Sequence, residues 1–163
     1  MSRPHRRKLP ELAGRVAAHA VLVDVLLEGE RLDHALERHH NGITDARERA
    51  LCRTLCVGVV RWHTRLTAIT KRLAKKAFKD RALEIPILLG LYQLLHTRVP
   101  DHAAIATSVD LARQVGFAHA SALVNAILRR FQREREALLR AVDETPEQRL
   151  AYPKWMVRQV RVA

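Results

Sequence analysis

The sequence predicts an all-α protein, a bundle of six to seven helices. Every long segment repeats its apolar residues at the helical spacing of three or four, and none alternates like a strand. Six glycines and six prolines are too few for a collagen-like or low-complexity chain. With 163 residues, 48% of them hydrophobic and 28% charged, the chain can form one water-soluble domain with its own core.

Two helices are predicted in the first 40 residues. The first spans about residues 10–28, because Pro10 is tolerated at a helix start and Gly29 is typical of a helix end. The second spans about residues 32–39. The Asn41-Gly42 pair that follows is common in hairpins, but neither flank alternates, so we expect a turn that ends the helix.

The middle of the chain is predicted to form a long amphipathic segment followed by a buried helix. Asp45 and Glu48 have the spacing of a capping box at the start of the long segment. Its apolar stripe over residues 52–73 fits either one helix or two helices broken near Trp62. Residues 85–96 are apolar almost all round, which predicts a helix at the centre of the bundle.

Further helices are predicted in the last third of the chain. Asp101 is a good N-cap residue for a helix that ends near Gly116. The next helix begins near His119, has the most regular apolar stripe, and continues toward Val142. A last short helical piece is expected over residues 155–160, after two prolines that interrupt the chain.

No catalytic or metal site is predicted. Cys52 and Cys56 are four apart and are expected to be buried thiols on one helix face, which fits a reducing cytoplasm. The histidines lack metal-ligand spacing; we interpret His39 and His40 as solvated residues at a helix end and give His102 a packing or capping role. Glycine-rich nucleotide loops, a Gly-x-Ser-x-Gly elbow and a His-Glu-x-x-His motif are all missing from the sequence.

The charge is strongly positive and clustered. The formal net charge is +12 and the isoelectric point about 10.9. Residues 1–8 contain four basic and no acidic side chains, and residues 71–81 contain six basic side chains and one acidic. Such clusters suit a polyanion. A membrane surface is the weaker partner, because residues 71–81 lack a broad apolar face, and no apolar run approaches the ~18 residues of a membrane span.

The two basic clusters, together with Arg15 one to two turns into the first predicted helix, supply the candidate RNA-binding side chains, which are Arg3, Arg6, Arg7, Lys8, Arg15, Lys75 and Lys76. An arginine-rich lead can become ordered on RNA, but many proteins simply begin with a basic tail, and the sequence leaves both readings open. Among the lysines, Phe78 offers a possible stacking ring, although a core role is the one we expect of it.

Four motifs occur in order: LCRTLCVGVVR (51–61), LGLYQLL (89–95), VPDHAA (99–104) and LVNAILR (123–129). Together they resemble the NusB-type helical domain over about residues 9–160. The resemblance is strongest to the version at the amino terminus of the RsmB (Sun/Fmu) enzymes, which methylate C5 of a cytosine in 16S rRNA. The VPDHAA junction and the YPKWMV segment (152–157), similar to the linker helix of those enzymes, favour this version over the free-standing NusB factor.

The resemblance implies a domain plan and a set of partners. Residues 1–9 are expected to form a flexible basic lead, residues 10–145 the helical domain, and residues 146–163 the start of a linker toward a catalytic domain. In the NusB family the arginine-rich start and first helix bind RNA, which supports the candidates from Arg3 to Arg15. Asn125 matches a family position on the sixth helix, where we expect its amide to bond a neighbouring backbone.

The chain departs from the enzymes in one large respect: it contains neither their glycine-rich S-adenosylmethionine loop nor their Pro-Cys and Thr-Cys-Ser motifs. We therefore expect no catalytic residue, no cofactor in this chain, and S-adenosylmethionine only in the absent catalytic domain. The leading hypothesis is a cytoplasmic RNA-binding domain that positions 16S rRNA for methylation. The alternatives are a free-standing transcription antitermination factor, or a helical module that docks on its own catalytic domain.

Overall fold

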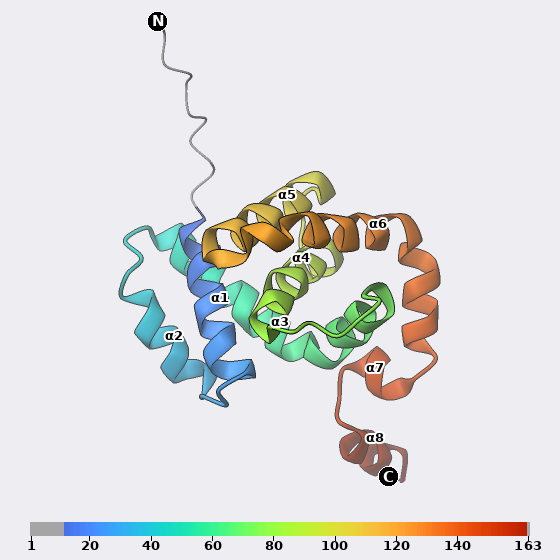
Figure 1. The fold of residues 1–163 in the computed structure, drawn as a ribbon. Coiled ribbons are helices and arrows are strands. Elements are labelled where there is room, and N and C mark those ends of the chain that lie inside the picture. Colours follow the sequence, from blue (N-terminus) through green and yellow to red (C-terminus); the bar gives the residue numbers. More distant parts are fainter. Residues whose placement is uncertain (1–11, 163) are drawn as a thin grey trace, which may run out of the picture.

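A computed structural model of the chain describes residues 12–162, so the expected lead over residues 1–9 lies outside the described part. Figure 1 shows that this part is all-helical, which confirms the predicted fold class. The α-helices are α1 (Ala13–Leu26), α2 (Leu32–His40), α3 (Ala46–Leu73), α4 (Glu84–His96), α5 (Asp101–Ala112), α6 (Ser121–Asp143), α7 (Pro146–Leu150) and α8 (Lys154–Val162). Three short helical turns connect them: η1 (Arg81–Leu83), η2 (Arg113–Phe117) and η3 (Ala118–Ala120).

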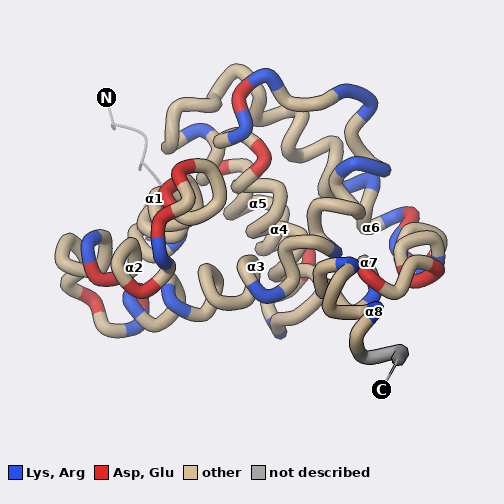
Figure 2. Tube along the Cα trace, turned by 90° about the horizontal axis from the view of Figure 1, so that it is seen from below, with Lys and Arg blue, Asp and Glu red and all other residues tan. Residues whose placement is uncertain are grey.

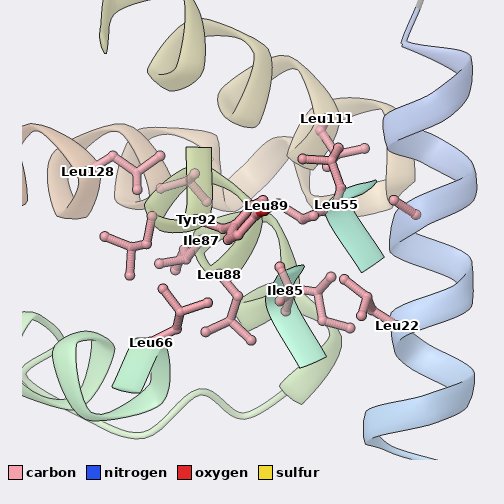
Figure 3. Packing of buried hydrophobic residues seen from close by; sticks show 14 of the residues in the cluster. Leu22, Leu55, Leu66, Ile85, Ile87, Leu88, Leu89, Tyr92, Leu111 and Leu128 are labelled. Carbon is pink, nitrogen blue, oxygen red and sulfur yellow. The ribbon is translucent and has the colours of Figure 1, made fainter. Parts of the chain in front are cut away.

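Helix α4 lies at the centre of the bundle, as its nearly continuous apolar sequence predicts. It packs against α1, α3, α5 and α6. Figure 3 shows its side chains meeting Leu22 of α1, Leu55 of α3, Leu111 of α5 and Leu128 of α6. These side chains are all fully buried. Burial of the leucine and isoleucine side chains of α4 removes apolar surface from water and so stabilises the fold.

Helix α3 is a single helix of 28 residues, which settles the question of a break near Trp62. The Trp62 ring stacks on the His96 ring of α4, with ring centroids 4.6 Å apart. The two helices approach closely at Gly58, where a Cβ atom would lie 2.1 Å from Cζ of Tyr92. Glycine is therefore required at this crossing despite its low helix propensity.

Two helix starts differ from the sequence predictions. The Asp45 side chain caps α3 as expected, accepting from the backbone N–H of Arg47 at 2.7 Å. Glu48, however, does not complete a capping box, because its carboxylate accepts from the backbone N–H of Gly14 at 2.6 Å and so caps α1 instead. Helix α5 begins one residue earlier than predicted, with Pro100 at the N-cap position and Asp101 inside the first turn.

The cysteines behave as predicted: Cys52 and Cys56 are both fully buried in the core. Among the described residues, no group of three or more histidine, cysteine, aspartate or glutamate side chains is placed to hold a metal ion. No helix in residues 12–162 is both long enough and apolar enough to cross a membrane.

Candidate nucleic-acid interface

The second basic cluster forms an irregular loop between α3 and α4. Helix α3 ends at Leu73, and Ala74 takes an extended backbone conformation. At the other end, the Asp80 carboxylate accepts from the backbone N–H of Ala82 at 2.9 Å and caps η1. We call residues 74–80 the lysine loop. In Figure 2 basic residues follow one another along it at the upper edge of the view.

The lysines of this loop are unpaired. Lys75, Lys76 and Lys79 are exposed, and none forms a hydrogen bond or ion pair with another described residue. Several arginines elsewhere are already engaged: Arg65 binds Asp143 at 2.8 Å, for example. Three ammonium groups on one short loop therefore remain available for an external anion, and flexible lysine side chains suit phosphate groups without fixed geometry.

An apolar groove of about 730 Å³ lies beside the loop. We call it the loop–α6 groove, because one wall is the lysine loop with the end of α3, and the other is the segment from η2 into α6. It is lined by Leu73, Ala74, Lys75, Lys76, Ala77, Phe78, Lys79, Asp80, Leu83, Phe117, His119, Ala120, Leu123, Ala126, Ile127 and Arg130. Apolar side chains form its floor and charged side chains its rim.

Two residues anchor the groove to the core. Phe78 and Phe117 are half-buried and pack against the core. Arg130 donates to Leu73 O at 3.1 Å, which joins α6 to the end of α3.

Asn125 is exposed on α6 and forms no hydrogen bond within the described part, so the structural role that we expected of its amide is not fulfilled there.

Arg15 occupies a different environment from the lysines. It is half-buried on α1, and its guanidinium donates to Oε1 of the buried Gln93 at 2.9 Å. Burial lowers the pKa of Arg15, while the nearby Glu48 carboxylate works in the opposite direction. The structure thus gives Arg15 a packing contact, and its role in RNA binding stays a prediction. The other candidates of the first cluster, Arg3, Arg6, Arg7 and Lys8, lie outside the described residues.

The histidine pair at the end of α2 is more ordered than we expected. His39 is not simply solvated: its Nε2 lies 2.6 Å from Oδ2 of Asp24 on α1, and Arg38 donates to the same oxygen at 2.6 Å. Burial pushes the pKa of Asp24 upward, but the hydrogen bonds from His39 and Arg38 hold it below the usual value. These contacts join α1 to α2 and serve the fold.

Comparison with known proteins gives one family and a consistent set of relatives. The NusB family model matches residues 13–133. The chain is 37% identical over 151 residues to ribosomal RNA small subunit methyltransferase B of Pseudomonas syringae pv. tomato, covering 91% of this chain and 34% of that protein. It is 38% identical over 149 residues to the same-named protein of Pseudomonas putida, covering 90% and 34%. The corresponding protein of Citrobacter koseri is 36% identical over 148 residues. The chain spans about a third of the length of these relatives.

Proposed function

Because the chain belongs to the NusB family, we propose that it is an RNA-binding domain that positions 16S rRNA for methylation at C5 of a cytosine. The single observation that carries the RNA-binding part is the lysine loop, which presents Lys75, Lys76 and Lys79 without a partner among residues 12–162. The relatives named as ribosomal RNA methyltransferases supply the substrate class. A cytoplasmic location follows from the proposal, since the ribosomal RNA is there.

The chain contributes binding rather than methyl transfer in this proposal. The residues present do not fit S-adenosylmethionine: the sequence has no glycine-rich loop for it, and the loop–α6 groove has a cationic rim that would repel the sulfonium. We therefore assign the reaction to the part of the relatives that this chain does not match. The chain alone is expected to transfer no methyl group from S-adenosylmethionine to a 16S rRNA fragment.

Phosphate groups of RNA are the ligands of the loop in this proposal. Each lysine that neutralises a phosphate releases counterions from the RNA, so affinity falls as salt rises, with a log–log slope of about −0.7 per contact for a single strand. The half-buried Phe78 holds the middle of the loop against the core. The lysines thus extend from an anchored backbone, which lowers the entropy lost on binding.

The test compares two triple variants that lose the same charge. In one, Lys75, Lys76 and Lys79 are changed to alanine. In the other, three exposed cations outside the loop are changed to alanine: Arg47, Arg53 and Arg98. Along α3, Arg53 is about 30 Å from the end that carries the loop. Binding to a fluorescent 16S rRNA fragment is measured by anisotropy from 50 to 200 mM salt.

The lysine variant is expected to bind more weakly. Its log–log salt slope should be smaller in magnitude by about 2, which is the value for three single-strand phosphate contacts. In the arginine variant the salt slope should change by less than half of this amount. Equal losses in both variants would show that binding depends on overall charge, and an unchanged slope in the lysine variant would remove the loop from the interface.

Exposed apolar side chains near the carboxyl end favour a second role beside RNA binding. Trp155 on α8 is 60% exposed, and Leu150 and Tyr152 are 39% and 37% exposed. We propose that this surface docks on the catalytic domain of the full-length enzyme, since tryptophan and tyrosine are common anchors of interfaces. Changing Trp155 to serine in the full-length enzyme should lower the temperature at which its two parts unfold together; an unchanged melting profile would contradict the docking.

A further inference from the structure

The loop–α6 groove has a composition that the lysine loop alone does not explain. The sequence has three phenylalanines, and two of them, Phe78 and Phe117, line this groove. Neither is fully buried. The ring of His119 lies beside Phe117, with centroids 6.2 Å apart and planes tilted by 56°. Aromatic rings are therefore concentrated at a surface where lysines are also concentrated.

The groove is large and apolar enough to hold a ring system. Its volume of about 730 Å³ falls within the ~300–1,000 Å³ that is usual for ligand sites. Leu123 on the α6 side is 45% exposed, an unusual exposure for a large apolar side chain in this protein. An apolar floor of this kind gains free energy when a planar group displaces water from it.

The charges at the rim select the ligand class. Lys75, Lys76 and Lys79 favour an anion, and they outnumber the one acidic residue of the lining, Asp80, which has one carboxylate oxygen engaged by the backbone N–H of Ala82 at 2.9 Å. Arg130 is also occupied, by Glu134 at 2.6 Å. An anionic backbone with flat apolar groups attached meets both requirements, and single-stranded nucleic acid has this chemistry: cationic side chains bind the phosphates while bases stack on aromatic rings.

We propose that the loop–α6 groove takes an unstacked base of single-stranded RNA against Phe78, while Lys75, Lys76 and Lys79 bind the flanking phosphates. The inference rests on the proposed RNA-binding function and names the part of the RNA that the surface recognises. Because most of the side chains that line the groove are apolar, the base is held mainly by stacking and apolar contact. Binding is thus expected to depend on an unpaired base and only weakly on its identity.

The test removes bases without changing charge. Wild-type chain is titrated with an octauridine and with the same ribose-phosphate backbone lacking its bases, at one salt concentration. The wild type should prefer octauridine by about 5- to 100-fold, the range for one stacked base. A Phe78→Leu variant keeps an apolar side chain against the core but loses the ring, so its preference should fall severalfold. Phe131→Leu, which changes a fully buried phenylalanine of α6, is the matched control and should keep the preference.

The outcomes separate this inference from the proposed function. If Phe78→Leu keeps the full preference for octauridine, the groove is not the base site, and an acidic helix of a protein partner becomes its better occupant. In that case the lysine variant would still lose salt dependence, so RNA binding by the loop would stand. Equal affinity of the wild type for both oligonucleotides would also overturn the base site. If no variant changes either the preference for octauridine or the salt slope, both proposals are overturned.

Discussion

Glu48 offers a sharp test of how the amino-terminal helix is held. Its carboxylate accepts from the backbone N–H of Gly14 at 2.6 Å and caps α1, although Glu48 itself belongs to the first turn of α3. No side chain at the helix start takes this role, because Leu12 occupies the N-cap position. Glu48→Ala therefore leaves the first turn of α1 without its acceptor and removes a negative charge beside Arg15.

The expected magnitude follows from the kind of bond that is lost. A hydrogen bond from an amide to a charged carboxylate contributes about 1.5–3 kcal/mol, so Glu48→Ala should lower the free energy of unfolding by about 2 kcal/mol. For a chain of this size that corresponds to a fall in Tm of about 4–8 °C. Glu48→Gln keeps an acceptor and loses only the charge, so about half of this loss is expected.

Urea unfolding followed by circular dichroism measures these losses. Glu37 on α2 is exposed and has no hydrogen-bonded partner among the described residues, so Glu37→Ala is the matched control and should change stability by less than about 0.5 kcal/mol. If Glu48→Ala and Glu37→Ala have the same stability, the cap on α1 contributes nothing and the reasoning is wrong.

Two further predictions concern the core and the histidines. Leu55 is fully buried against α4, and Leu55→Ala should cost about 3 kcal/mol in urea unfolding; a loss below 1 kcal/mol would contradict the packing. Burial lowers the pKa of His19, His63 and His96 from the usual 6.5. The unfolded chain therefore binds more protons below about pH 6.5, so the free energy of unfolding should fall between pH 7.5 and 5.5. His19→Gln, which can still donate to Ala82 O, should make that fall shallower, and an unchanged pH dependence would refute the assignment.

Most of the helices could be predicted from the sequence because they have a complete local signal. The apolar stripe of α3 and the continuous apolar run of α4 indicate which faces are buried. Helix α2 ends with Asn41 at its C-cap as predicted, whereas α1 ends at Leu26, two residues before its predicted end. The short helix α7 was not predicted, because its five residues, which begin with one proline and end three residues before another, carry too little periodicity. Its Pro146 stands at the helix start, where proline is tolerated.

Contacts between distant segments could not be predicted in the same way. The capping box assigned Glu48 to its own helix, whereas the fold brings Gly14 within reach of its carboxylate. The hydrogen bond from Arg15 to Gln93, 78 positions away, could not be foreseen from the sequence either, and the RNA contact of Arg15 stays a prediction. The loop–α6 groove joins Phe78 to Phe117 and Leu123, and no local pattern in the sequence relates these residues.

Photo-crosslinking shows directly whether RNA binds at the lysine loop. The full chain is irradiated with a 16S rRNA fragment in which uridine is replaced by 4-thiouridine, and the crosslinked peptides are identified by mass spectrometry. Binding at the lysine loop predicts crosslinks within residues 74–80 and near Phe117 or Leu123, which line the same groove. Crosslinks confined to α2, α5 or α8, with none in the lysine loop, would contradict it.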